Sequence, residues 1–200
     1  MVSTNRLNRF QQVAASRQPG TVVLEDISDP HNAEAIFRSC DSFGIHKVHL
    51  IAEATQSFNP LALGKASSSS ANKWLCCEQH ESTSGCLSEL RAGGYTLFAT
   101  VLDPAAESIF EADLDVPLPA IMFGNEHSGL SESAINQADR LITIPMQGIV
   151  QSLNISVSAA LCLFELTRQR QAGNSVNKCV NEDDRQEILS FLLQRHHKRK

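Results

Sequence analysis

Polar side chains that could do chemistry follow two apolar runs in the second half of the chain. Residues 120–123 and 141–144 have the composition of buried strands, and each run breaks at once into a loop with glycine or proline. The first loop carries Glu126, and the second carries Ser152 and Asn154. A carboxylate, a hydroxyl and an amide can orient a ligand by hydrogen bonds, and loops at strand ends commonly carry function. These two loops are therefore the candidate site.

Helix capping is the competing interpretation of the second loop. Residues 155–166 are apolar on nearly all sides, so we expect a helix that is buried on most of its faces. Ser152 or Asn154 is placed to cap this helix, because either side chain can accept a hydrogen bond from a free backbone N–H of the first turn. A structural role stays open for both.

The common phosphate and metal motifs do not fit these loops. Gly124 and Gly129 are spaced as in a P-loop, but Leu130 and Ser131 stand where lysine and a hydroxyl residue are required. No G-x-G-x-x-G pattern occurs, which excludes the usual dinucleotide fingerprint and the glycine-rich loop of ordinary Rossmann methyltransferases. The seven histidines are dispersed along the chain, so we expect no metal site.

Composition indicates one domain that spans residues 1–200, with short helical extensions at residues 1–20 and 174–200. The hydrophobic content of 42% fits a substantial core, and no apolar run is long enough to cross a membrane. Without an evident signal segment we expect a cytoplasmic protein whose six cysteines are reduced. The net charge of -5 means that nucleic acid would have to meet a local basic face.

Strand and helix patterns alternate along the chain, which predicts an α/β fold with a mostly parallel sheet covered by helices on both faces. The expected strands are residues 21–27, 47–52, 74–78, 95–102, 120–123 and 141–144. The expected helices are residues 5–16, 33–44, 82–92, 131–138, 155–166 and a last one from near Glu182. The irregular connection 55–72, with Lys65, is either a linker or a substrate contact.

Three segments in order resemble the motifs of the SpoU, or TrmH, family of RNA 2'-O-ribose methyltransferases in the SPOUT superfamily. They are residues 30–51 (PHNAEAIFRSCDSFGIHKVHLI), 124–130 (GNEHSGL) and 144–160 (IPMQGIVQSLNISVSAA). Residues 17–27 further resemble the branch that methylates the D-loop guanosine-18 of tRNA. The resemblance implies a C-terminal deep trefoil knot, S-adenosylmethionine as cofactor, tRNA or another structured RNA as partner rather than DNA or a membrane, and a homodimer.

By this resemblance the cofactor lies among three loops, residues 99–102, 123–126 and 144–154. The implied cofactor-binding residues are Thr100, Gly124, Ile144, Met146 and Leu153. Apolar walls with a few fixed backbone donors suit an adenine ring. Taken without the family, each of these residues reads as part of the core at a strand end.

The resemblance also implies catalytic roles for Arg38, Asn32, Glu126, Ser152 and Asn154. Arg38 stands six positions after Asn32, as the motif requires, and is either the base or an electrostatic positioner; a guanidinium holds its proton too firmly to be a good base. Asn32 would orient Arg38 or a substrate oxygen, or else cap its helix. Glu126 would pair with an active-site arginine, or else precede the next helix as a surface charge. Ser152 and Asn154 would hold ribose or phosphate.

Three other functions remain open at this point, one of them an ordinary α/β small-molecule binder, which only a failure to bind the cofactor would support. The same chemistry could act on another tRNA position or on ribosomal RNA, although only about twenty residues precede the first strand, which favours tRNA over enzymes with an added RNA-binding domain. A non-catalytic knotted dimer that binds RNA or S-adenosylmethionine is the second alternative. The chain ends after one helix and the basic residues 196–200, where the tRNA branch continues further. That departure bears on the RNA target rather than on the chemistry.

Overall fold

A parallel sheet forms the centre of the computed structural model, which describes residues 2–55, 59–60, 71–173 and 175–197. The described residues make seven strands in the order β3-β2-β1-β6-β4-β7-β5, and all their pairings are parallel. The strands are β1 Gln18–Glu25, β2 Ile45–Ile51, β3 Cys76–His80, β4 Thr96–Thr100, β5 Glu107–Ser108, β6 Pro119–Phe123 and β7 Arg140–Thr143.

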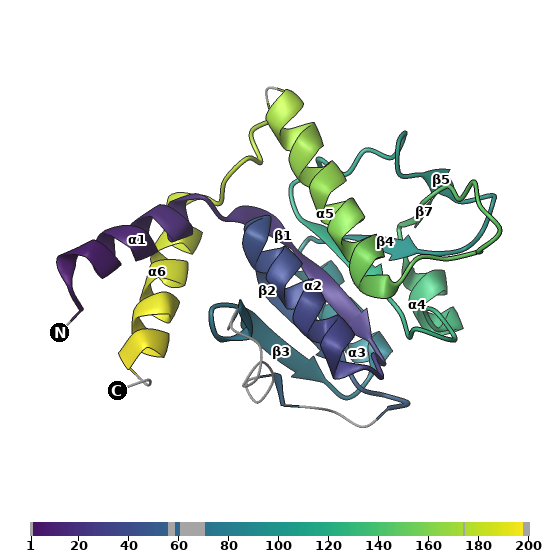
Figure 1. Ribbon diagram of the computed structural model, residues 1–200, viewed down its shortest axis with the longest axis horizontal. Coiled ribbons are helices and arrows are strands. Elements are labelled where there is room, and N and C mark those ends of the chain that lie inside the picture. The colour runs from purple at the N-terminus through teal and green to yellow at the C-terminus, as the bar shows by residue number, and fades with distance from the viewer. Residues whose placement is uncertain (1, 56–58, 61–70, 174, 198–200) are drawn as a thin grey trace.

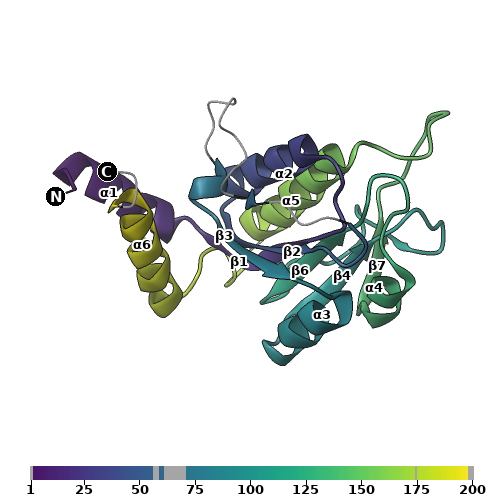
Figure 2. The same cartoon turned by 90° about the horizontal axis from the view of Figure 1, so that it is seen from below.

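Helices cover both faces of this sheet, as the sequence predicted (Figures 1 and 2). The helices are α1 Thr4–Ala15, α2 Pro30–Ser42, α3 Thr83–Ala92, α4 Glu132–Gln137, α5 Ile155–Ala172 and α6 Glu182–His197, with a 3-10 turn, η2, at Ala71–Lys73. Figure 2 shows α2 and α5 on one face and α3 and α4 on the other. Each face has its own apolar core cluster, so the prediction of an α/β fold is confirmed.

The two terminal helices, α1 and α6, pack on each other beside the sheet (Figure 1). Their contact forms a third cluster with Phe10, Ala14, Ile188 and Leu192 at its centre. Phe10 also stacks against Trp74, with ring centroids 5.6 Å apart. The buried apolar side chains of α6, Ile188 and Leu192, therefore pack on α1 of the same chain.

Most expected elements are found within two residues of their predicted ends, but β1 and α2 each begin three residues early and α5 runs on to Ala172, six residues past its predicted end. The strand expected at residues 74–78 is β3, Cys76–His80, because Trp74 follows the η2 turn and Leu75 is fully buried. The two-residue β5 was missed. Lys65 and most of the connection 55–72 lie outside the described residues, as do residues 198–200.

Helix α5 is buried or half-buried at nine of the residues 155–166, as expected, but it has one exposed side that the pattern did not indicate. Its side chains Val157, Leu161 and Phe164 are 45%, 40% and 54% exposed, and their spacing places them on one side of the helix. An apolar pattern identifies side chains that avoid water, but it does not show which neighbour covers them.

Within the described residues no helix combines the length and hydropathy needed to span a bilayer.

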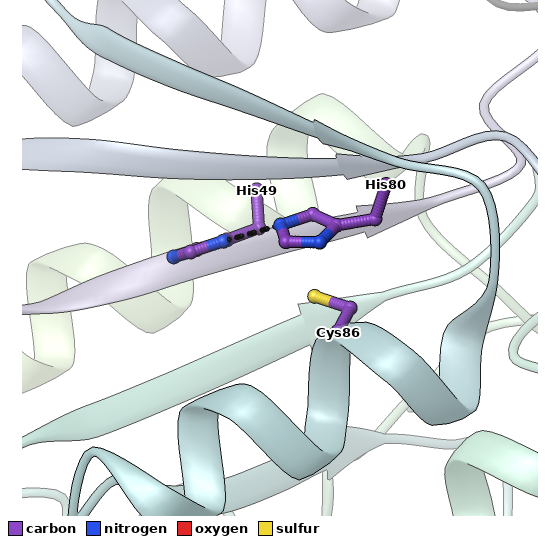
Figure 3. Close-up of side chains that lie close together, drawn as sticks. All are labelled: His49, His80 and Cys86. Carbon is purple, nitrogen blue, oxygen red and sulfur yellow. Dashed lines mark hydrogen bonds between the residues drawn. The ribbon is translucent and has the colours of Figure 1, made fainter.

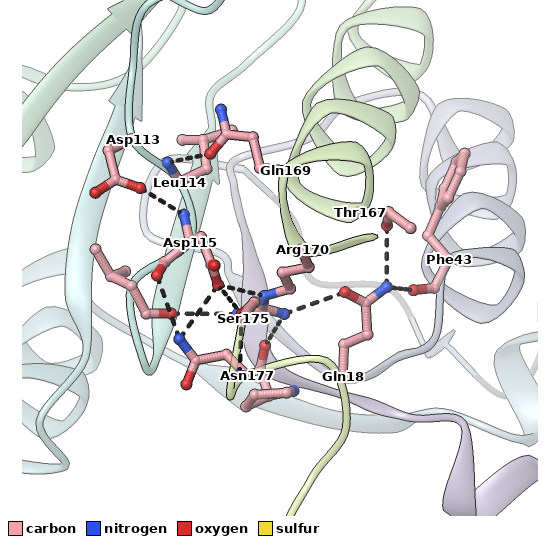
Figure 4. A network of polar contacts seen from close by, with 12 residues as sticks. Gln18, Phe43, Asp113, Leu114, Asp115, Thr167, Gln169, Arg170, Ser175 and Asn177 are labelled. Atoms are coloured by element: carbon pink, nitrogen blue, oxygen red, sulfur yellow. Dashed lines mark hydrogen bonds and ion pairs between the residues drawn. The ribbon is translucent and has the colours of Figure 1, made fainter. Parts of the chain in front are cut away.

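The C-terminal end of α5 is fixed by a buried arginine (Figure 4). Arg170 is fully buried and donates to the carbonyls of Pro19 at 2.9 Å and Val116 at 3.2 Å, and it lies 3.4 Å from the Asp115 carboxylate. The neighbouring Gln169 bonds the same segment through Ala112 and Leu114. One helix end thereby joins β1 to the chain that leads into β6.

Candidate functional site

A cavity of about 390 Å³ lies where β4, β6 and β7 end. Its wall is made by the loops after these three strands and by the first turns of α5. The volume falls in the range of roughly 300–1,000 Å³ that is usual for small-molecule sites. The five residues predicted to bind a cofactor all line this cavity: Thr100, Gly124, Ile144, Met146 and Leu153. The structure thus brings these five residues together in one cavity, while their role in binding a cofactor stays a prediction.

The Thr100 hydroxyl is occupied in holding the sheet together, since it donates to the Met122 carbonyl at 2.8 Å. This bond joins the end of β4 to β6, so what Thr100 can offer a ligand is chiefly its backbone. Ile144, Met146 and Leu153 are half-buried and supply apolar wall. The cavity therefore combines apolar side chains with strand-end backbone groups.

Gly124 is required by the way the loop 124–130 folds back on itself. A Cβ built at Gly124 would lie 2.1 Å from the carbonyl carbon of Gly129 and 2.1 Å from the nitrogen of Leu130. The return of the chain is closed by two backbone hydrogen bonds between Asn125 and Gly129, of 3.0 and 2.9 Å, and Gly129 has a φ of +72° that favours glycine. Gly124 thus shapes this side of the cavity through the absence of a side chain.

Glu126 is held by four hydrogen bonds from the segment that begins α2. It accepts from the backbone N–H of Ser28 at 3.0 Å, the Ser28 hydroxyl at 2.7 Å, the Asp29 N–H at 3.2 Å and the Asn32 amide at 2.9 Å. Partial burial raises the pKa of Glu126, but the bonds from Asn32 and Ser28 outweigh it and lower the pKa to about 2. The carboxylate is therefore ionised at neutral pH.

The expected ion pair between Glu126 and an arginine does not form among the described residues. Its bonds go instead to Ser28, Asp29 and Asn32, which tie the loop after β6 to the start of α2. The alternative of a plain surface charge does not describe it either, because four donors converge on it. Its role in catalysis stays a prediction.

Asn32 connects the first and last of the three motif segments. Its amide oxygen accepts from the Asn154 amide at 3.0 Å while its own NH₂ donates to Glu126. The interpretation of Asn32 as a helix cap is wrong, because Asp29 caps α2 by accepting from the His31 N–H at 2.9 Å. Glu126, Asn32 and Asn154 form one hydrogen-bonded row at the rim of the site.

Asn154 also caps α5, so the capping interpretation of this residue is confirmed, while its role in holding ribose or phosphate stays a prediction. Its side-chain oxygen accepts from the Ser156 N–H at 2.8 Å and from the Ser156 hydroxyl at 2.6 Å. Ser152 is not the cap; it is exposed, lines the cavity, and makes no hydrogen bond within the described part of the chain. Its hydroxyl is thus available to a ligand.

Arg38 lies on the exposed side of α2 and is not part of the cavity wall that the described residues form. Arg38 and Asn32 lie on the same helix, α2, and the first turn of this helix is at the rim of the site. Ser158 and Cys162, which sequence reasoning missed, line the cavity from α5. The signal was present, because both follow Asn154 at steps of four residues along one face of the helix.

Comparison with known proteins identifies close relatives. The model of the SpoU rRNA Methylase family matches residues 19–164. A protein of Thermus thermophilus named tRNA (guanosine(18)-2'-O)-methyltransferase is 39% identical over 194 residues, which cover 95% of this chain and 96% of the relative. The crystal structure of the TrmH/SpoU tRNA modifying enzyme of A. aeolicus has a TM-score of 0.78 at 28% identity and covers 95% of this chain and 96% of that one.

A second solved structure concerns the cofactor. The SpoU methyltransferase AviRb of Streptomyces viridochromogenes, in complex with AdoMet (S-adenosylmethionine), has a TM-score of 0.66 at 27% identity. The match covers 81% of this chain and 62% of AviRb.

Proposed function

This chain belongs to the SpoU rRNA methylase family, and from that premise we propose that it transfers a methyl group from S-adenosylmethionine to the 2'-hydroxyl of guanosine-18 in tRNA. The observation that carries the proposal is the T. thermophilus relative of that name, which matches almost the whole length of both chains. The acceptor oxygen is absent from DNA, so RNA is the substrate class. A tRNA substrate also puts the activity in the cytoplasm.

The lining of the cavity fits the proposed cofactor. Apolar walls from Ile144, Met146 and Leu153 suit an adenine ring, and the backbone at Thr100 and Gly124 offers fixed hydrogen-bonding groups beside it. When bound, S-adenosylmethionine supplies an electrophilic methyl group on a sulfonium centre. The protein must align the acceptor oxygen with that methyl group and help the hydroxyl to lose its proton.

We assign the handling of the acceptor to Arg38 and the row of Glu126, Asn32 and Asn154. The ionised Glu126 fixes the Asn32 amide, so that its oxygen faces Asn154 and the rim keeps one geometry. Arg38 either stabilises the alkoxide that develops on the ribose or holds a neighbouring phosphate. It is poorly suited to be the base, because a guanidinium holds its proton too firmly. Ser152, with its free hydroxyl, contacts ribose or phosphate.

Transfer of tritium from labelled S-adenosylmethionine to unmodified bulk tRNA, followed by mapping of the labelled nucleotide, tests the function. Label on the 2'-oxygen of guanosine-18 is the expected result. Label at another tRNA position, or on ribosomal RNA alone, would keep the chemistry and overturn the target. Cofactor binding without label on any RNA would leave a non-catalytic RNA binder as the function.

A C-terminal trefoil knot is also part of the proposal. It is supported by the order of the strands: β6 is inserted between β1 and β4, and β7 lies on the far side of β4. After β7 the chain returns to the start of α2, where Asn154 meets Asn32, and then runs on to the buried Arg170. A crystal structure in which the backbone of residues 144–172 does not pass through a preceding loop would contradict the knot.

A homodimer is the remaining part of the proposal, with a second copy of the chain on α5. Val157, Leu161 and Phe164 form an exposed apolar stripe on α5. Phe43 packs against this stripe, with its ring edge-on to that of Phe164 and the ring centroids 6.4 Å apart. Contiguous exposed apolar side chains of this kind mark interaction sites. Sedimentation should give twice the monomer mass for the parent protein and a monomer for Phe164→Glu. Val176→Glu is the matched control, since Val176 is 91% exposed and lies off the stripe.

A further inference from the structure

Two histidines and a cysteine meet on the sheet face that α3 covers, away from the cavity (Figure 3). His49 comes from β2, His80 ends β3, and Cys86 lies in α3. The Nδ1 atom of His49 is 2.9 Å from Nε2 of His80. One ligand atom from each residue lies within 4.8 Å of the other two. Spacing along the chain did not indicate this cluster, because strand pairing and the α3 packing bring its members together.

We propose that His49, His80 and Cys86 bind a zinc ion that fastens the edge of the sheet. Two imidazoles and a thiolate are ligands that zinc prefers. In a tetrahedral site two nitrogens, each about 2.0–2.1 Å from the metal, lie roughly 3.3 Å apart. The facing nitrogens of His49 and His80 are 2.9 Å apart, which is close to that separation, so small side-chain rotations would make room for the ion between them.

Burial suits a structural metal site at this place. Cys86 is fully buried and the side chain of His49 is 5% exposed, while that of His80 is 13% exposed and marks the side from which an ion can enter. Binding releases the thiol proton of Cys86 to solvent, and each imidazole keeps its proton on the nitrogen that faces away from the ion. The oxidation state of the metal does not change.

Two carboxylates complete the surroundings. Glu78 Oε2 lies 3.6 Å from Nδ1 of His49, the nitrogen that faces His80, while its Oε1 pairs with Lys47 at 3.4 Å. Glu78 is not part of the 4.8 Å cluster, so it would have to turn toward the ion to become the fourth ligand. Glu89 Oε2 lies 3.6 Å from Nδ1 of His80, the nitrogen on the other side of that ring. A carboxylate behind a metal-binding imidazole fixes the orientation of the ring, so Glu89 is a positioning residue.

The competing explanation is a hydrogen bond between the two histidine rings. It accounts for the 2.9 Å contact, but it does not require a thiol on the third side or carboxylates beside both rings. The metal has a clear structural use here, because β3 pairs within the described residues with β2 alone. An ion would join β2, β3 and α3 at one point.

Cobalt(II), which takes the place of zinc in such sites, gives the sharpest test. The full chain, stripped with a chelator and dialysed, should bind stoichiometric Co²⁺ with a thiolate-to-metal absorption band, and Zn²⁺ should displace it. Cys86→Ala should lose the band. Cys40→Ala should keep it, because Cys40 is equally buried but belongs to the core cluster on the other face. Far-UV circular dichroism verifies that each variant is folded.

Variants of the other residues separate a metal site from a histidine pair. His80→Gln should abolish stoichiometric uptake, and Glu89→Gln should weaken Co²⁺ binding roughly 10-fold without removing the band. A stripped parent protein that takes up no Co²⁺ or Zn²⁺ would overturn the proposal. So would uptake that Cys86→Ala and His80→Gln leave unchanged. The test does not depend on methyl transfer, so its outcome is separate from that of the proposed function.

Discussion

Replacing Gly124 with alanine tests how the loop after β6 shapes the site. The added Cβ would lie 2.1 Å from backbone atoms of Gly129 and Leu130, where ordinary contact begins near 3.4 Å. Backbone cannot rotate out of the way as a side chain can, so the two passes of the loop must separate by roughly 1 Å. The hydrogen bonds of 3.0 and 2.9 Å between Asn125 and Gly129 are then strained or broken.

The size of the effect follows from these contacts. Two backbone hydrogen bonds contribute about 1 kcal/mol each, and overpacking costs about 1–3 kcal/mol. We therefore expect Gly124→Ala to lose about 3–5 kcal/mol of unfolding free energy, which lowers the urea midpoint by about 2 M at a slope of about 2 kcal/mol/M. A domain whose unfolding free energy lies well within the usual range of about 5–15 kcal/mol stays folded after this loss. Because Glu126 follows in the same loop, its bonds to α2 shift and cofactor affinity falls as well.

Urea unfolding at one fixed protein concentration and calorimetric titration with S-adenosylmethionine measure both effects. The matched control is Gly148→Ala, since Gly148 lies in the other loop of the site and a Cβ there meets nothing within 4 Å. The control should keep the parent midpoint. A Gly124→Ala protein with the midpoint and cofactor affinity of the parent would refute the reasoning about this loop.

Three further predictions concern charged residues. Arg38→Ala should lower methyl transfer at least about 100-fold, with unchanged urea midpoint and cofactor affinity, and near-parent turnover would remove Arg38 from the mechanism. The pKa of Glu126 falls from 4.5 to about 2 in the folded chain, so its contribution to stability is present above pH 4.5 and is lost as the pH falls toward 2. Glu126→Gln should flatten the decline of unfolding free energy in that window, whereas parallel curves would show that the four bonds do not hold in solution. Arg170→Met should cost about 3–5 kcal/mol in urea unfolding, because Asp115 and two carbonyls lose a buried donor. Its control is Arg168→Met on the same helix, 51% exposed and paired with Glu165, which should cost less than about 1 kcal/mol.

The alternation of the fold could be predicted because its strands and helices carry clear local patterns. Residues 120–123 are apolar at every position, as a central strand requires, and Ser131 stands before its short helix as the cap. The two-residue β5 could not be predicted, because Glu107 and Ser108 have no apolar pattern and, in the part of the chain that the structure describes, pair with the end of β7 alone. Local patterns identify elements but not their partners, which is why the exposed side of α5 was missed.

The site residues were found as types, but their contacts could not be. Glu126 and Asn154 stand in polar loops after apolar runs, and this marks them in the sequence. That both would meet on Asn32 depends on the order of β1, β6, β4 and β7, which no local pattern encodes. The misassigned cap at Asn32 has a local origin, since Asp29, three residues earlier, is an equally good cap residue and takes the role.

The position of β1 between β2 and β6 also sets the order in which this chain can fold. Val22 pairs with Val48 on one side and with Ile121 on the other. During synthesis Val48 emerges early, but Ile121 is made only 99 residues after Val22, and such distant parallel pairing is slow. Until then β1 presents an open row of backbone donors and acceptors, the kind of edge that recruits other chains. A ribosome that stalls before residue 119 would therefore release a fragment that aggregates, whereas one that stalls in the segment after α5 would release a chain with its sheet complete.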